Sequence, residues 1–364
     1  MSILFDPGWR WWHCLLCCHV LLVAFSGPAL AEGDTGGYRL GSGYALGDSG
    51  VRLGGYASSK YKKLDPAPAK FEVSDLSLFV IWDGGGRWQG FSELEIGEAV
   101  FWEKDRGWST DETEFELERT YLDYLYSPEL KIRLGKFLTP IGHWNQVHAD
   151  PLTWTVSRPL TTDAGFAHHL TGMMLHGEWL FDDHELEYQL YVDDSTHLDP
   201  KPDNPSPAGR DLPGVEIGTF EHAVGGRLLL KSVDSDWQLG SSLVNFGIEG
   251  YEGRKTLLGL DFLWRRGGHE WSGEAIYRFD TGEHEHPEWG VFLQGIVPLH
   301  ARWSLVLRQE RYTEVAFDQP IDLSNVGLAW RPIAPLVFKL ERRWGAENEL
   351  FAPDGWFASA AVLF

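Results

Sequence analysis

The stretch Glu185-Leu-Glu-Tyr-Gln-Leu-Tyr-Val-Asp193 alternates strictly between polar and apolar side chains. Leu186 and Leu190 fall on one face of an extended chain, and Glu187 and Gln189 fall on the other. Successive side chains of a β-strand point to opposite sides of the sheet, so a period of two residues predicts a strand. One face of this strand must meet an apolar environment, and the other must meet water.

The same alternation recurs along the chain and predicts sixteen strands, an even number. The predicted strands cover residues 51–62, 71–82, 88–102, 112–126, 130–138, 169–181, 184–193, 223–231, 237–248, 255–265, 269–279, 288–298, 302–312, 321–332, 335–344 and 355–364. In 88–102 and 112–126 the alternation slips, around Gly97 and around Arg119.

The connections between the predicted strands alternate in length. The odd-numbered connections hold 6 to 30 residues and the even-numbered ones hold 2 to 5, many of them rich in turn-forming glycine. One end of the sheet is therefore trimmed to tight turns while the other carries longer loops. That asymmetry is typical of bacterial outer-membrane barrels.

Composition excludes several classes of protein. Acidic residues outnumber basic ones 53 to 31, which argues against nucleic acid as a partner because phosphate binding needs clustered Lys and Arg. The apolar fraction of 43% argues against a disordered acidic chain. Beyond the first 31 residues no apolar run is long enough for a transmembrane helix.

The N-terminal residues 1–31 are interpreted as a cleaved signal peptide, with a short apolar core and the small-residue pattern Ala29-Leu-Ala31. A retained N-terminal anchor is the alternative. All three cysteines lie in this segment, so the mature chain has no disulfide. Residues 32–50 are predicted to be a flexible segment. Residues 51–364 then form the barrel, with long outer loops at 139–168 and 194–222.

The predicted last strand runs Trp356-Phe-Ala-Ser-Ala-Ala-Val-Leu-Phe364 and ends on an aromatic residue. Trp356, Val362 and Phe364 lie on its apolar face. This ending resembles the C-terminal signal that the barrel-assembly machinery of the outer membrane reads.

These observations together predict an all-β fold, a single transmembrane antiparallel β-barrel of about 16 strands. Lipid offers no hydrogen bonds to the backbone, so a sheet that crosses it must close on itself. The polar face of each strand then lines a water-filled lumen.

The segment Arg133-Leu-Gly-Lys-Phe-Leu-Thr-Pro-Ile-Gly-His-Trp-Asn145 resembles the strand-to-loop passage of the phosphate-selective porin O/P type, with weaker likeness over about residues 51–178. The resemblance implies an outer-membrane porin, possessing a third outer loop (139–168) that folds into the barrel and narrows it. It also implies a homotrimer. The barrel itself predicts contact with outer-membrane lipid, and acidic residues of the longer connections either meet lipopolysaccharide through divalent cations or keep the surface solvated. We expect passage of small solutes or ions without a cofactor.

Charged residues predicted to line the pore and its constriction are of both signs, which does not fit the ladder of Arg and Lys that phosphate selectivity needs. They are Lys131, Arg133, Arg158, Arg227, Arg308, Glu116 and Glu118. A mixed lining favours passive diffusion of small polar or charged solutes across a transverse field.

Two alternatives remain open. The barrel could act as an outer-surface receptor, an adhesin or a metal-capture protein, with His284 and His286 as candidate metal ligands in a Glu-rich loop. A weaker alternative is an outer-membrane hydrolase. The sequence has no Gly-x-Ser-x-Gly elbow and no His-Glu-x-x-His motif, so no catalytic residue is assigned and the chain is predicted not to be an enzyme.

Overall fold

The computed structural model describes residues 37–163, 165–199, 220–248, 253–280, 287–313, 319–345 and 352–364. The chain divides into two compact units, Met1–Arg39 and Leu40–Phe364, and the barrel belongs to the second. The predicted signal peptide lies outside the described residues. Among the described residues, no helix is both long enough and apolar enough to cross a lipid bilayer.

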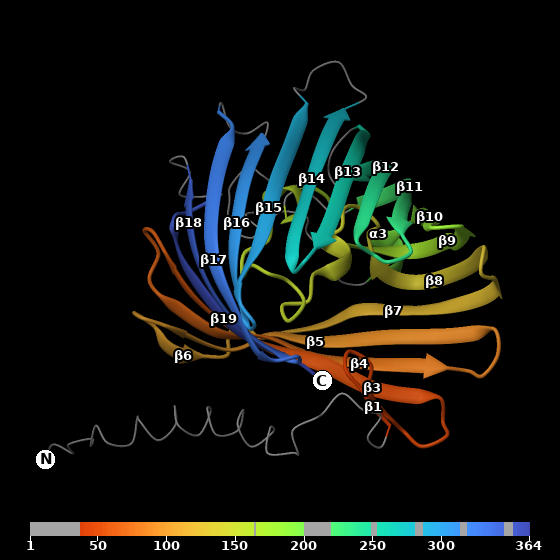
Figure 1. Ribbon diagram of the computed structural model, residues 1–364, viewed down its shortest axis with the longest axis horizontal. Coiled ribbons are helices and arrows are strands. Elements are labelled where there is room, and N and C mark those ends of the chain that lie inside the picture. Colours follow the sequence, from red (N-terminus) through yellow and green to blue (C-terminus); the bar gives the residue numbers. More distant parts are fainter. Residues whose placement is uncertain are drawn as a thin grey trace, which may run out of the picture. The chain divides into compact units, whose positions relative to one another are not determined.

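Sixteen long strands form one closed antiparallel barrel (Figure 1). They are β3 (Val51–Leu64), β4 (Lys70–Asp83), β5 (Trp88–Glu103), β7 (Glu114–Ser127), β8 (Leu130–Leu138), β9 (His169–Phe181), β10 (His184–Asp193), β11 (Phe220–Ser232), β12 (Trp237–Ile248), β13 (Lys255–Arg266), β14 (His269–Asp280), β15 (Glu288–His300), β16 (Trp303–Thr313), β17 (Ile321–Ile333), β18 (Leu336–Gly345) and β19 (Gly355–Leu363).

The short elements within the described residues are three strands and three helical turns. They are β1 (Tyr38–Arg39), β2 (Gly43–Ala45), β6 (Gly107–Ser109), the 3₁₀ turn η1 (Asn145–Val147), α2 (Leu160–Asp163) and α3 (Ser195–Leu198). β2 pairs with β3, and β6 pairs with β5. The predicted strand count and antiparallel order are confirmed, with ends that differ by three residues or fewer.

The barrel closes where β19 pairs with β3, from Gly355 opposite Leu64 to Leu363 opposite Tyr56. The last residue extends this pairing, because the Phe364 N–H donates to the Gly55 carbonyl (2.9 Å) and the Gly55 N–H donates to the Phe364 carbonyl (3.0 Å). Each long strand that the structure describes therefore has a partner on both sides, as a sheet in an apolar solvent requires.

The two slips of alternation mark β-bulges. Between the pairs Val73–Val100 and Asp75–Gly97, β5 carries one extra residue, and Glu98 there has a φ of +47°. Between the pairs Glu93–Arg119 and Leu94–Leu117, the extra residue of β7 is Glu118. A bulge redirects side chains relative to the sheet, so a strict period of two fails at these places.

Burial in the barrel is inverted relative to a water-soluble protein. Outward side chains are apolar and exposed, for example Leu260 at 64% and Leu239 at 54%. Inward side chains include charged groups that are almost completely buried, such as Arg278 at 2% and Glu341 at 1%. Charged groups are rarely buried unless they are paired, so the interior must be a dense network of ion pairs and hydrogen bonds.

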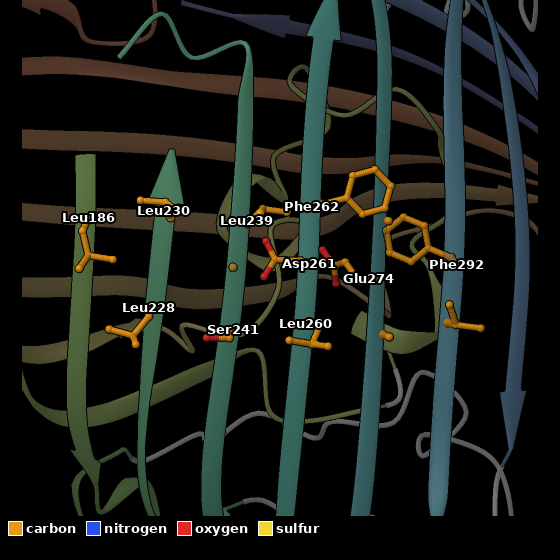
Figure 2. A pocket seen from close by; sticks show the side chains of 14 residues that line it. Leu186, Leu228, Leu230, Leu239, Ser241, Leu260, Asp261, Phe262, Glu274 and Phe292 are labelled. Carbon is orange, nitrogen blue, oxygen red and sulfur yellow. The ribbon is translucent and has the colours of Figure 1, made fainter. Parts of the chain in front are cut away.

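Figure 2 shows part of the outer face, where leucines of β10, β11, β12 and β13 lie side by side. They form a shallow apolar hollow of about 490 Å³. Asp261 and Glu274 also border it, but both side chains are buried and form their contacts inside the barrel. The alternation thus puts an apolar surface and a charged surface on the two sides of one wall.

Tryptophans are half-exposed on the outer face near the short turns. They are Trp82, Trp88, Trp179, Trp264, Trp271 and Trp303, each 38–45% exposed. Trp303 stacks on Trp330 with ring centroids 5.5 Å apart, and Trp179 stacks on Tyr188 at 4.8 Å. An aromatic belt therefore follows the short-turn end of the barrel.

Gly55 is a sensitive position for barrel closure, because a Cβ there would lie 2.1 Å from the Ser77 carbonyl oxygen and 3.0 Å from the Phe364 ring. We expect Gly55→Ala to destabilise the folded barrel by about 1–3 kcal/mol, since overpacking forces the backbone apart. The measurement is the denaturant midpoint of the refolded protein. Gly86→Ala, where a Cβ meets nothing within 4 Å, is the control. Equal midpoints for the two variants would contradict this account of closure.

Candidate functional site

The connection between β8 and β9, residues 139–168 and called the inner loop from here on, lies within the barrel rather than beyond its rim. In Figure 1 its yellow to yellow-green ribbon lies inside the space that the strands surround. Its side chains and backbone contact inward-facing residues of β14, β16 and β18. Ile141, Phe166 and Thr162 are at most 1% exposed.

The strands β14, β16 and β18 contact the inner loop and are called the far wall from here on. Cationic side chains of this wall bind oxygen atoms of the loop. The Lys339 ammonium of β18 donates to the Asp150 carboxylate (2.8 Å), the Thr153 hydroxyl (3.0 Å) and the Thr155 carbonyl (3.1 Å). Arg308 of β16 donates to the Thr155 hydroxyl (2.6 Å) and the Ser157 carbonyl (3.0 Å). Both side chains are nearly completely buried; Arg308 also donates to Glu310 (2.7 Å) and to the Ser157 hydroxyl (2.7 Å), so each buried cation has several acceptors.

Carboxylates of the same wall hold the loop through its backbone N–H groups. Glu341 of β18 accepts from the Val156 N–H (2.8 Å), and Glu310 of β16 accepts from the Leu160 N–H (2.7 Å). Glu274 of β14 accepts from the Trp144 N–H (2.6 Å). A charged acceptor makes such a hydrogen bond roughly twice as strong as a neutral one. The far wall therefore fixes both the position and the backbone conformation of the loop.

A cavity of about 60 Å³, called the central cavity, lies between the inner loop and the strands β3, β4, β5 and β7. We call these four strands the near wall. The near wall contributes Tyr56, Lys60, Asp75, Glu95 and Glu118, and the loop contributes Trp144, His148, Asp150, Thr153, Val156 and Arg158. Four of these side chains are carboxylates and two are permanent cations, so the lining is mixed but has an acidic excess.

Pairs of groups fix the near wall of the central cavity. Lys60 lies 3.1 Å from the Asp75 carboxylate, and the Tyr56 hydroxyl donates to Glu95 at 2.8 Å. Ser58 also donates to Asp75. These contacts hold opposite charges next to one another on a single face of β3, β4 and β5.

Two imidazoles face one carboxylate beside this cavity. The Glu118 oxygen Oε1 lies 3.1 Å from Nε2 of His169 and 3.6 Å from Nε2 of His148. Burial lowers the pKa of His148, so its ring is neutral near pH 7. Within the described part of the chain, neither ring nitrogen of His148 has a hydrogen-bond partner. The β7 bulge is what turns Glu118 into the interior next to Arg119, which pairs with Glu93 at 2.5 Å.

A second cavity, of about 140 Å³, lies on the other side of the inner loop. His143 and Gln146 of the loop line it together with Glu187, Gln189, Arg227, Leu229 and Gln238 of the wall. Arg227 is held by two parallel hydrogen bonds to Asp261, at 2.6 and 2.8 Å. Such bidentate pairing fixes the guanidinium plane.

The structure distributes the predicted pore residues over several places. Glu118 and Arg158 line the central cavity, and Arg227 lines the second cavity. Arg308 contacts the inner loop instead. Lys131 and Arg133 lie toward the short-turn end of β8, paired with Glu178 (3.3 Å) and Asp123 (2.7 Å). Glu116 lies 3.7 Å from Lys136.

The other predicted positions are the metal ligands and the C-terminal signal. His284 and His286 lie outside the described residues. Trp356 and Phe364 are 48% and 41% exposed on the outer face, whereas Val362 is 7% exposed.

Sequence reasoning missed two sets of residues. Lys60 and Asp75 were not assigned to the site. Between the pairs Ser58–Asp75 and Lys60–Glu72, β4 carries one extra residue relative to β3, which breaks the alternation that would have placed Asp75. Asp194, His197 and His222 bring three potential metal-ligand atoms within 4.8 Å of one another, on segments 25 residues and more apart in sequence. The density of His and Asp around the predicted loop at 194–222 was the available signal.

No protein-family model matches this sequence. An uncharacterised protein of Aquifex aeolicus (strain VF5) is 33% identical over 113 residues, which is 30% of this chain and 24% of that protein. The match spans about a quarter of that relative's length, so it carries no conclusion about the whole protein.

Solved structures of outer-membrane channels share the fold. The outer-membrane channel DcaP of Acinetobacter baumannii aligns with a TM-score of 0.59 and 12% identity, over 89% of this chain and 100% of its own. An anion-selective porin from Comamonas acidovorans gives 0.57 and 12%, over 86% and 98%. OmpF of Salmonella typhi, in complex with daunomycin, gives 0.58 and 9%, over 88% and 99%. At such low identity the likeness establishes the fold alone, which is a porin-type barrel.

Replacing Lys339 by Met should loosen the inner loop, because the variant loses several hydrogen bonds to a charged donor, each worth about 1.5–3 kcal/mol. A loss of 1.4 kcal/mol raises the population of the displaced loop about tenfold. We expect faster hydrogen exchange of the loop amides, measured by mass spectrometry. The control is Glu185→Gln, which removes an ion pair with Lys231 (3.0 Å) away from the loop. Unchanged exchange in Lys339→Met would show that Lys339 does not hold the loop.

Proposed function

We propose that this chain is a passive porin of the bacterial outer membrane that lets small polar or charged solutes diffuse through the barrel. The observation that carries the proposal is the inverted barrel wall, with leucines outside and paired charges inside. Such a wall suits lipid on one side and water on the other. The aromatic belt near the short turns fits the girdles of such barrels. The porin-type fold supports the same conclusion.

We further propose that the inner loop narrows the path for solutes, leaving the central cavity as its constriction. Support comes from the anchoring of the loop to the far wall and from the charges that face each other across the cavity. Buried polar atoms need partners. Among the described residues neither ring nitrogen of His148, a residue that lines the cavity, has a hydrogen-bond partner, and Nε2 lies 3.6 Å from the Glu118 carboxylate.

The lining of the central cavity favours cations over anions in this proposal. Asp75, Glu95, Glu118 and Asp150 outnumber Lys60 and Arg158, and they still outnumber the bases when Lys339, which pairs with Asp150, is counted. Phosphate selectivity of the porin O/P type, which the Arg133–Asn145 resemblance suggests, would need an excess of bases along the path. We therefore retain the resemblance for the barrel type and not for the solute. A homotrimer, contact with lipopolysaccharide, recognition of Phe364 by the assembly machinery and a cleaved signal peptide rest on the resemblance and on sequence pattern.

Planar-bilayer recordings of the purified protein test the porin function. We expect stable ion conductance and, across a KCl gradient, a reversal potential on the cation-selective side. A unit charge 4 Å from an ion changes its energy by about 1 kcal/mol even in water, which corresponds to about fivefold in an equilibrium. Glu118→Gln should therefore reduce the cation preference, and Lys60→Gln should increase it, each by a factor of this order.

The matched control is Glu129→Gln, which removes a carboxylate from a short turn outside the interior. Its reversal potential should equal that of the unmodified protein. A folded protein without conductance would overturn the porin proposal. If all variants conduct ions with identical reversal potentials, the porin proposal stands, but the assignment of the central cavity as the constriction is wrong.

Lipid contact of the outer face has a separate test. Leu260 lies at the middle of β13 and is 64% exposed, so Leu260→Arg should destabilise the barrel in lipid vesicles by about 2–4 kcal/mol if this position faces the bilayer midplane. Denaturant unfolding in vesicles measures the change, and Leu260→Ala is the control for lost side-chain volume. If the arginine and alanine variants were equally stable, this face would not meet lipid.

A further inference from the structure

Three potential metal ligands converge where β10 leads into α3 and β11 begins. Nδ1 of His197 lies 2.7 Å from Oδ1 of Asp194, and Nδ1 of His222 lies 3.1 Å from the same oxygen. The two imidazole rings stack with centroids 5.8 Å apart and an interplanar angle of 12°. Both rings thus present the same nitrogen to one carboxylate.

We propose that Asp194, His197 and His222 form a binding site for one divalent transition-metal ion. Two imidazoles and a carboxylate are a ligand set that suits Zn²⁺, and also Ni²⁺ and Cu²⁺, rather than Ca²⁺ or Mg²⁺, which prefer oxygen ligands alone. Three protein ligands leave a coordination position for water. The site lies at the long-loop end of the barrel, which is the outer surface if the proposed porin orientation is correct.

The spacing of the ligand atoms already resembles a coordination sphere. With metal–ligand distances of about 2.0–2.1 Å, neighbouring ligand atoms lie about 2.9 Å apart in octahedral and about 3.4 Å apart in tetrahedral geometry. The separations of 2.7 and 3.1 Å fall at this scale, and all three ligand atoms lie within 4.8 Å of one another. The 2.7 Å contact is a hydrogen bond between Nδ1 of His197 and the Asp194 carboxylate, so an ion that binds here displaces the shared proton.

Hydrogen bonds already join the backbone segments that carry these ligands before any ion binds. The Thr196 hydroxyl of α3 lies 2.9 Å from the Phe220 carbonyl and 3.3 Å from the Glu221 carbonyl of β11. The Asp194 N–H donates to the Thr171 carbonyl of β9 at 3.0 Å. A ligand set held on a rigid scaffold binds with a smaller loss of conformational entropy.

All three side chains remain open to solvent, with exposures of 43% for Asp194, 67% for His197 and 52% for His222. An ion can therefore enter without opening the barrel. Glu221, the neighbour of His222 in sequence, interacts electrostatically with His197 and adds a negative charge nearby. A bound ion would join α3 to β11, on either side of the connection that includes residues 200–219.

Zinc titration of the full-length protein, refolded in detergent without an affinity tag, tests the site by calorimetry. We expect one Zn²⁺ per chain, and Co²⁺ substitution should give visible absorption bands of a nitrogen- and oxygen-ligated ion. The double variant His197→Ala/His222→Ala should lose more affinity than the roughly 10–100-fold that loss of an outer-shell partner costs. Asp194→Asn, nearly isosteric, should weaken binding while preserving the barrel.

Two controls separate this site from other histidines. His300→Ala removes an exposed histidine near a short turn and should leave zinc binding unchanged. His284→Ala/His286→Ala tests the loop pair that the sequence suggested. Loss of binding in that pair but not in His197→Ala/His222→Ala would overturn the proposal, as would the absence of stoichiometric binding. Conductance of the same samples shows whether the porin proposal stands independently.

Discussion

Backbone hydrogen bonding imposes the constraint on which the rest of this structure depends. A sheet with a leucine-covered exterior must leave no edge, and the chain meets this requirement by pairing its last strand with its first long one. The terminal Phe364 completes the closure through two hydrogen bonds to Gly55. Closure in turn creates an interior, and alternation along every strand determines which side chains face it.

The interior charges serve distinct purposes that their sequence pattern does not distinguish. Lys339 and Glu341 lie two residues apart on the inward face of β18, and both bind the inner loop. Arg227 of β11 and Asp261 of β13 pair with each other on the inner side of the barrel wall. Lys60, Asp75 and Glu118 border the central cavity. A charged residue on a lumen face is thus more often a structural partner than a group available to a passing solute.

The strands could be predicted from the sequence because alternation is a local property, and the antiparallel order followed from the short turns. The bulges of β5 and β7 were visible only as faults in that pattern, since a bulge depends on the partner strand. The site was less accessible to sequence reasoning. Arg308 fits a lumen position by alternation, but its hydrogen bonds to Thr155 and Ser157 join segments about 150 residues apart. No local pattern encodes that partnership.

The anchoring of the inner loop also has a consequence for the order of assembly. The loop lies in the first half of the chain, but its hydrogen-bond partners on Glu274, Glu310 and Glu341 follow 112 to 185 residues later. Until β18 is in place, the loop cannot reach its final position, and the buried carboxylates of that wall lack their donors. The strand that supplies the most distant of these contacts, β18, is also the neighbour of β19, which forms the seam with β3, so the anchoring of the loop and the closure of the barrel depend on the same end of the chain.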